Sequence, residues 1–357
     1  MFATIFIFIA LIAVLIMVHE AGHFFTAKKA GIKVEEFGFG FPPRIFGIQR
    51  GETLYSLNLI PLGGFVKIFG EEGEYTEDSR SFSNRTAGVR SLIISAGVLM
   101  NMALAMVLFS AGHMIGLPTI LEDGASEKNF TRVQIQVIEI ASESPAMTSG
   151  LAIGDVIVSI DGKRFDAIDG LRGYVDARRG KEISIEVLHD GVSKILAASP
   201  RENPPEGEGP LGFAMVKTAI EKLSWHQAIG RGIKDSFVLA WLFLKALGDL
   251  FLGLFTTGKI SGDVTGPVGI AVLTGRVVKL GIAHLLQFAG VISVNLALIN
   301  IFPIPALDGG RLLFILLEKL KGRPIPRLVE QKIHQVSFVV LLTLMLLVTV
   351  RDVVRLF

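Results

Sequence analysis

Residues 2–27 read FATIFIFIALIAVLIMVHEAGHFFTA. The part from Phe2 to Val18 carries no charged residue, and about 20 mainly apolar residues are enough to cross a bilayer as a helix. We expect a retained membrane span rather than a cleaved signal peptide, because no basic region precedes it and no small-residue cleavage site follows it. The span ends on HEAGH (19–23), and this motif decides which fold and which chemistry the remaining sequence has to support.

The HEAGH motif places two imidazoles and a carboxylate at one end of the span. His19 and His23 are four residues apart and share a helix face, so together they can hold one zinc ion. Glu20 is then placed to act as general base toward water. The alternative is a pair of interfacial histidines with an accidental glutamate, and the cost of ionisable residues inside a span argues against it.

The composition agrees with a membrane protein. Of the 357 residues, 50% are hydrophobic and only 19% are charged, whereas a soluble domain carries about 25% charged residues. The net charge of +2 gives no indication of nucleic acid as a partner. The chain has no cysteine, which excludes disulfides, cysteine-based zinc fingers and a thiol nucleophile.

Three further apolar segments predict a helical protein with about four membrane spans. They are Ser91–Leu117, Gly281–Leu307 and Val336–Val350. A fifth stretch, Ser236–Thr257, is interrupted by Lys245 and Asp249. We expect this stretch to lie at the membrane surface or to re-enter the membrane without crossing it.

Two polar intervals separate the apolar segments. In the first, YSLNLIPLGGFVKIFG (55–70) predicts two short strands about a Gly-Gly bend, a membrane-associated β-hairpin. In the second, VIVSIDGKRF (156–165) and KEISIEVLHDG (181–191) predict strands of a small inserted α+β domain. We therefore divide the chain into 1–121 with the HEAGH helix, the hairpin and the second span, 122–210 as the inserted domain, and 211–357 as the C-terminal membrane part.

Lysine and arginine residues near the segment ends predict the orientation. They gather in two intervals: Lys28, Lys29, Lys33, Arg44 and Arg50 after the first segment, and Lys319, Lys321, Arg323, Arg327 and Lys332 before the last. Both intervals are expected on the cytoplasmic side. The inserted domain is then extracytoplasmic, and the HEAGH motif lies near the cytoplasmic face.

A catalytic zinc ion usually has three protein ligands and one open position, so a third ligand is expected elsewhere. The candidates are His113, Asp249, Asp263, His284 and Asp308. Asp308 is favoured because it lies in NIFPIPALDGGRLLF (300–314), where prolines and glycines break an apolar run, as membranes tolerate only beside a cavity. Its alternative role is a helix N-cap. His19 and Asp308 can meet only if residues 236–257 do not cross the membrane.

These residues resemble a known family. HEAGH, PLGGFVKIFGE (61–71), GPVGI (266–270) and SVNLALINIFPIPALDGGRLLF (293–314) occur in the order seen in site-two intramembrane metalloproteases, most like the bacterial regulator-of-sigma-E protease group. The resemblance covers essentially the whole chain. It implies that His19, His23 and Asp308 bind zinc, that Glu20 is the catalytic acid and base, and that the chain lies in a bacterial inner membrane.

The resemblance also implies partners. Substrates are expected to be single-span membrane proteins, such as anti-sigma factors or signal-peptide remnants, and membrane lipid surrounds the spans. Asn295 and Asn300 are expected to bind the substrate backbone, with interhelical hydrogen bonds as their alternative role. A helical substrate has to unwind before cleavage, and the hairpin could then pair with it as an added strand.

The inserted domain resembles a PDZ domain in the stretch ESPAMTSGLAIGDVIVSIDGKRF (143–165), and a generic small β-domain is the alternative. A PDZ domain could capture a peptide C-terminus or exclude bulky substrates. Two other readings of the whole chain are an inactive scaffold, which would tolerate loss of Glu20 or of a ligand, and a transporter, which would show internal repeats. The intact motif and the absence of a repeat in the sequence disfavour both.

Overall fold

Two compact units make up the protein in the computed structural model. The structure describes residues 2–71, 75–121, 130–189, 191–205, 207–221, 223–257, 266–323 and 325–354. One unit, here called the helical unit, combines Met1–Ala111 with Ala228–Phe357, and the other, the inserted unit, is Gly112–Gln227. Asp263, Thr265 and part of the acidic run 71–78 lie outside the described residues. The division at 122–210 stays a prediction.

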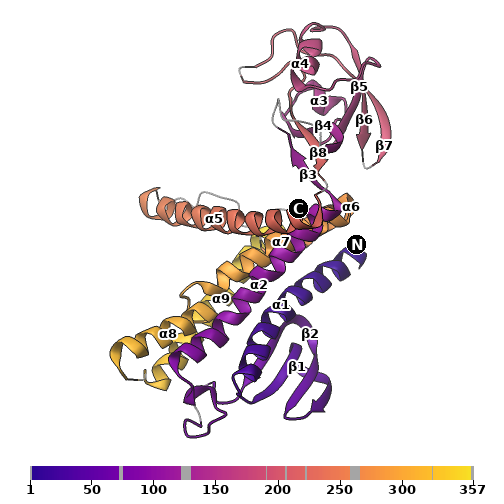
Figure 1. Cartoon of the computed structure of the whole chain (residues 1–357). Helices are drawn as coiled ribbons and strands as arrows, with labels where there is room; N and C mark the ends of the chain where they lie inside the picture. Colours follow the sequence, from indigo (N-terminus) through magenta and orange to yellow (C-terminus); the bar gives the residue numbers. More distant parts are fainter. Residues whose placement is uncertain are drawn as a thin grey trace. The chain divides into compact units, whose positions relative to one another are not determined.

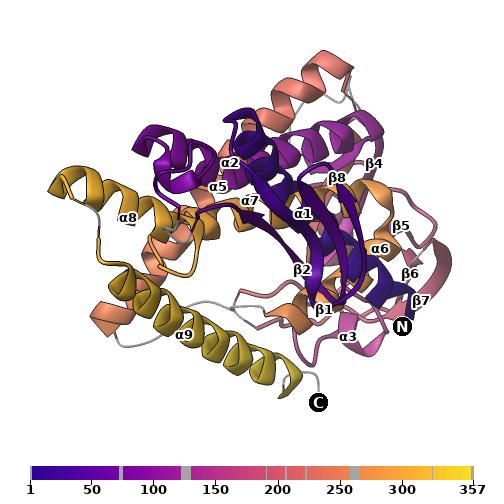
Figure 2. The same cartoon turned by 90° about the horizontal axis from the view of Figure 1, so that it is seen from below.

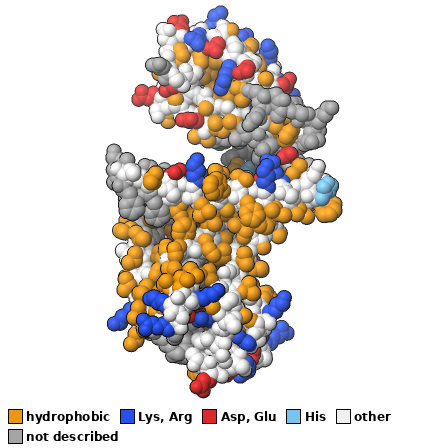
Figure 3. Space-filling view, turned by 60° about the vertical axis from the view of Figure 1, so that its left-hand side comes forward, with side chains coloured by type: hydrophobic (Ala, Val, Ile, Leu, Met, Phe, Trp, Pro, Cys, Tyr) orange, Lys and Arg blue, Asp and Glu red, His pale blue; other side chains and the backbone are white. Residues whose placement is uncertain are grey.

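Four helices of the described chain are long and apolar enough to cross a membrane, which confirms the predicted number. They are α1 (Phe2–Lys29), α2 (Ala87–Ile115), α7 (Ile282–Ile301) and α9 (Arg327–Val354). Figure 1 shows α1, α2 and α7 running side by side, and Figure 3 shows hydrophobic side chains covering the middle of the helical unit with Lys and Arg toward its ends. Helix α5 (Trp225–Thr257) is not among the four and runs across one end of them.

The last two apolar segments differ from their predicted bounds. The third helix was expected to reach Leu307 but ends at Ile301, because Pro303 and Pro305 cannot continue it. A separate helix, α8 (Asp308–Lys321), follows, with a left-handed Gly322 as its C-cap. Helix α9 begins before the predicted Val336, since its first turns are polar enough to face water. The short helix α6 (Pro267–Leu280) precedes α7 and packs on α1 and α9.

The first polar interval forms a curled hairpin of β1 (Val34–Arg50) and β2 (Thr53–Ile68). Residues 36–39 of β1 pair with 54–57 of β2 on one side and with 64–67 of β2 on the other. The predicted pair of short strands about the Gly-Gly bend is therefore wrong in its pairing: the two halves of β2 flank β1 instead of each other. The prediction missed β1, whose Gly and Pro residues conceal an extended segment.

The hairpin packs against the C-terminal half of α1 (Figures 1 and 2). The Phe24 ring of α1 lies 5.0 Å from the Phe37 ring and 6.0 Å from the Tyr55 ring, measured between centroids. Phe24 belongs to a buried cluster with Ile32 and Ile93, and a short 3-10 helix (Phe82–Asn84) contributes Phe82 to it. This cluster joins the HEAGH helix, the hairpin and α2 into one body.

The inserted unit has a six-stranded sheet in the order β3-β8-β4-β5-β6-β7. Its strands are β3 (Leu117–Ile120), β4 (Phe130–Ile140), β5 (Val156–Ile160), β6 (Ile183–His189), β7 (Val192–Ala198) and β8 (Phe213–Glu221), with helices α3 (Pro145–Thr148) and α4 (Ile168–Asp176). The two predicted strands correspond to β5 and β6. Alternating residues of these strands form the core, among them Ile160, Ile183 and Ile185.

Two isoleucines of adjacent strands test this core. Ile185 of β6 is 0% exposed, whereas Ile195 of β7 is 74% exposed. We expect Ile185→Ala to lower the free energy of unfolding of the inserted unit by about 2–5 kcal/mol, because it leaves a cavity. Ile195→Ala should change it by less than about 1 kcal/mol. Proteolysis of the full chain at increasing urea concentration measures both, and equal effects would contradict the assignment of the core.

Candidate metal centre

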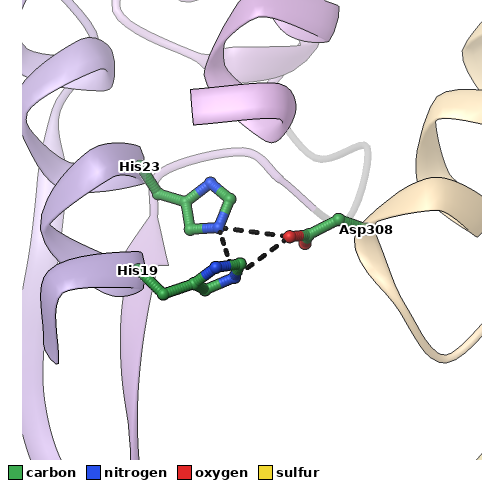
Figure 4. A group of neighbouring side chains, drawn as sticks. All are labelled: His19, His23 and Asp308. Carbon is green, nitrogen blue, oxygen red and sulfur yellow. Dashed lines mark hydrogen bonds and ion pairs between the residues drawn. The ribbon is translucent and has the colours of Figure 1, made fainter. Parts of the chain in front are cut away.

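Helix α1 carries both histidines of the HEAGH motif on one face. His19 and His23 are 8% and 9% exposed, and their ring centroids are 4.8 Å apart. Their side chains point from α1 toward α8, where Asp308 points back at them (Figure 4). The i, i+4 spacing thus brings two imidazoles to one point, as the sequence predicts.

Asp308 reaches this point because the chain turns sharply between α7 and α8. A Cβ atom on Gly309 would lie 2.1 Å from the Ile301 carbonyl oxygen, and one on Gly310 would lie 2.3 Å from that of Ile304. Only glycine therefore fits at these two positions. The N-cap of α8 is Leu307, without a side-chain cap hydrogen bond, so the alternative role of Asp308 as the N-cap is wrong.

The three side chains offer a triangle of ligand atoms. His19 Nε2 lies 3.1 Å from His23 Nε2 and 3.1 Å from Asp308 Oδ2, and His23 Nε2 lies 3.4 Å from Asp308 Oδ2. A tetrahedral ion with ligands at about 2.0–2.1 Å separates those ligands by about 3.3 Å. The geometry therefore fits one metal ion with a fourth position left for water or substrate.

Hydrogen bonding leaves these atoms ready for a cation. His23 Nδ1 donates to the Ile93 carbonyl at 2.9 Å, which fixes the tautomer with its lone pair on Nε2. Among the described residues, buried Asp308 Oδ2 accepts no hydrogen bond.

Gly97 of α2 forms the wall beside the two imidazoles. A Cβ atom at this position would lie 2.3 Å from His23 Nε2 and 2.8 Å from His19 Nε2, that is, on the ligand atoms themselves. Gly97 is a functional residue that the sequence pattern does not predict. In the sequence, Gly97 is only a small residue within a span, and small residues are also common where two membrane helices pack together.

Not every candidate joins the group. Among the described residues, only His19, His23 and Asp308 form a cluster able to hold a metal, so His113, Asp249 and His284 are not brought to it. Asn295 and Asn300 lie on α7 and are half-buried. Neither belongs to the cluster, and their predicted role in substrate binding stays a prediction.

Glu20 lies between the metal ligands and the hairpin. It is half-buried, and a Cβ atom on Gly64 of β2 would lie 3.4 Å from its Cγ. Gly64 begins the outer half of β2, Gly64–Ile68, which pairs with β1 on one side only. We call this segment the edge strand. Glu20 is therefore next to a metal ligand in the chain and packs against the first residue of the edge strand.

Comparison with known proteins agrees with this geometry. Residues 7–344 match the family model described as peptidase family M50. The chain belongs to peptidase family M50. A peptidase is what the HEAGH motif predicts, so family membership confirms that prediction and the resemblance found in the sequence.

Individual relatives cover the peptidase almost end to end. A Clostridium perfringens protein, whose name places it among the zinc metalloproteases, is 35% identical over 353 residues and 98% of both chains. Zinc metalloprotease RasP of Geobacillus kaustophilus is 29% identical, over 98% of this chain and 97% of its own. The PDZ domain of an SdrC-like protein from Listeria monocytogenes matches 24% of this chain and 90% of its own at 21% identity, but its TM-score of 0.22 supports no argument.

The close approach of Gly97 to the two imidazoles can be tested through the metal affinity. Gly97→Ala should lower the metal affinity of the peptidase about tenfold or more, because the added methyl group occupies the space of the ligand atoms. Alanine itself favours a helix, so α2 should persist. Gly88→Ala is the matched control, since a Cβ atom there meets nothing within 4 Å. Elemental analysis of metal per purified chain measures both, and equal metal content would contradict this account.

Proposed function

We propose that the protein is a zinc-dependent endopeptidase that hydrolyses peptide bonds within the membrane segments of single-span proteins. The observation that carries this proposal is the cluster of His19, His23 and Asp308 at the end of an apolar helix long enough to cross a membrane. Two imidazoles and one carboxylate are a ligand set typical of catalytic zinc. The names of the relatives agree with zinc as the metal.

Glu20 supplies the proton transfer. Zinc bound by the three ligands supplies the Lewis acidity that amide hydrolysis needs. As the oxygen of the attacking water bonds to the amide carbon, the Glu20 carboxylate takes a proton from that water. Glu20 then returns the proton to the amide nitrogen as the C–N bond breaks. One carboxylate therefore serves both halves of the reaction.

The edge strand provides a way to hold the substrate. A helical membrane segment hides its amides in its own hydrogen bonds, so it has to be cleaved in an extended form. The edge strand has an unused side among the described residues, and it begins beside Glu20. An unwound segment paired there would have its backbone groups satisfied and would pass close to the metal. Asn295 and Asn300 are further candidates for contacts with this backbone.

The inserted unit is suited to bind peptides as a PDZ domain does. Strand β3 pairs only with residues 218–221 of β8, which leaves the first half of β8 with an open edge among the described residues. A cavity of about 400 Å³ lies between this half of β8 and α4, and its lining includes Leu171, Val175 and Met215. An extended peptide with an apolar end fits such a groove.

The charge distribution favours one orientation in a bacterial inner membrane. The basic intervals after α1 and before α9 predict a cytoplasmic location for the hairpin and for the metal centre near it. The inserted unit is then extracytoplasmic, and α5 lies along the opposite membrane surface. Trp225 and Trp241 on α5 are exposed, as is usual for aromatic residues at a membrane interface.

The catalytic role of Glu20 is tested by substitution. Glu20→Gln should reduce cleavage of a co-expressed, tagged single-span substrate at least a thousandfold while the chain keeps its metal, because the amide cannot accept the proton. Glu52→Gln on the exposed turn of the hairpin is the control and should cleave like the wild type. If Glu20→Gln gives the same product as the wild type, the scaffold alternative becomes the better account.

The metal requirement is tested by removal. A chelator should stop cleavage by the purified protein in detergent, and added zinc should restore it. The reason is that two imidazoles and a carboxylate cannot themselves replace the metal as the Lewis acid. Asp308→Asn should bind the metal more weakly and lose most activity even with zinc in excess, since an amide oxygen is a poorer ligand. Full activity after complete removal of the metal would overturn the zinc mechanism.

A further inference from the structure

Three elements meet at the metal centre, and each supplies one component. Helix α1 supplies His19, His23 and Glu20, helix α8 supplies Asp308, and β2 supplies the edge strand. The metal ligands join α1 to α8, and the close approach of Gly64 to Glu20 joins α1 to β2. The remaining two elements, β2 and α8, are joined by an ion pair of Glu71 with Arg311.

Glu71 is tied firmly to the edge strand. It follows the end of β2, and its backbone N–H donates to the Ile68 carbonyl at 3.2 Å. The backbone N–H of Phe69, two residues before Glu71, donates to the Lys33 carbonyl at 3.0 Å, which anchors the turn to the start of the hairpin. A force on the Glu71 side chain is therefore transmitted directly to the edge strand.

Arg311 is tied just as firmly to Asp308. It lies three residues after Asp308 on α8, about one helical turn away, and next to Gly310, which packs on the turn before α8. Its guanidinium Nη1 donates to Glu71 Oε1, although the two residues are 240 positions apart in the chain. The Glu71 side chain is 19% exposed and that of Arg311 43%, so part of the pair is shielded from water.

We propose that Glu71 and Arg311 are positioning residues that hold the edge strand at a fixed distance and register from Asp308, and so select which peptide bond of a bound segment faces the metal. This inference rests on the proposed function, because it requires the edge strand to bind the substrate. It assigns neither residue a contact with the reacting atoms. A strand slip of one residue would present the other face of the segment, so a fixed register decides the cleavage site.

A second ion pair on α8 provides the matched control. Arg90 of α2 donates to Glu318 of α8 at 2.8 Å, with side chains 20% and 19% exposed. Both pairs line the same cavity of about 830 Å³ between α2, α8 and α9. The Arg90 pair links α8 to another helix but not to the edge strand, so it should support α8 without affecting the register.

The first test is charge reversal with cleavage-site mapping in the full chain. Arg311→Glu and Glu71→Arg should each lower kcat/KM at least tenfold and add new product ends in mass spectrometry, with the metal retained. The double variant restores the opposite charges and should return kcat/KM to within about threefold, with the original product end. Arg311→Lys keeps the charge and should cleave at the original site. Arg90→Glu should leave the product end unchanged.

The second test measures the position of the hairpin without using activity. The chain has no cysteine, so Gln49→Cys on β1 and Leu320→Cys on α8 give two unique sites for spin labels. The distance distribution should be narrow in the chain with native Glu71 and Arg311, should broaden or shift in Arg311→Glu, and should narrow again in the charge-reversed double variant.

The outcomes separate this inference from the proposed function. If the wild-type chain cleaves and the single reversals cleave at the same site and rate, the inference is overturned while the peptidase assignment stands. Failure of the double variant to recover either cleavage site or distance also overturns it, as does loss of metal in the single variants. A wild-type chain that cleaves no membrane substrate overturns the proposed function, and with it the role of the pair in choosing a bond.

Discussion

Two imidazole nitrogens and a carboxylate oxygen lie within 3.4 Å of one another beside an apolar span, and this proximity is the constraint on which the structure depends. Lone pairs so close together repel, and burial removes the water that would screen them. A cation among them converts the repulsion into three bonds. The arrangement is therefore stable only with a proton or a metal ion at its centre, and the spacing suits the metal.

Several unrelated local features converge to make this arrangement possible. Gly97 leaves α2 without a side chain where the imidazoles need space, and Gly309 and Gly310 let the chain turn so tightly that Asp308 starts α8 beside them. The carbonyl of Ile93 fixes the tautomer of His23. Gly97 and Ile93 lie on α2, and Gly309 and Gly310 lie at the start of α8, while the imidazoles themselves lie on α1. The site is thus a property of the packed helices, and none of the elements has it alone.

The sequence predicted the features that follow from local pattern. The i, i+4 histidines, the four apolar segments and the broken run before Asp308 each have a signature within about 25 residues. Most of the features it missed are tertiary, apart from strand β1 and the bounds of the last two apolar segments. Nothing in residues 34–50 shows that residues 36–39 insert between two segments of β2, and nothing near Glu71 shows that its partner is Arg311. Gly97 has the same appearance as any small residue in a span, so only the neighbouring imidazoles reveal its role.

The contacts that hold the metal ligands differ from those that hold the edge strand, and the difference has a functional meaning. The metal ligands are buried or half-buried and converge from two helices, and their placement matters because a displacement of about 1 Å at the reacting atoms costs about a hundredfold in rate. The edge strand is joined to α8 by the partly exposed ion pair of Glu71 with Arg311, and by Ile68, which lies in the same buried cluster as Ile315 of α8. If the edge strand binds the substrate as proposed, these two links set the position of a bound segment relative to the metal. Helix α8 then carries both a metal ligand, Asp308, and the residue that holds the edge strand, Arg311, so one helix relates the register of the segment to the position of the metal.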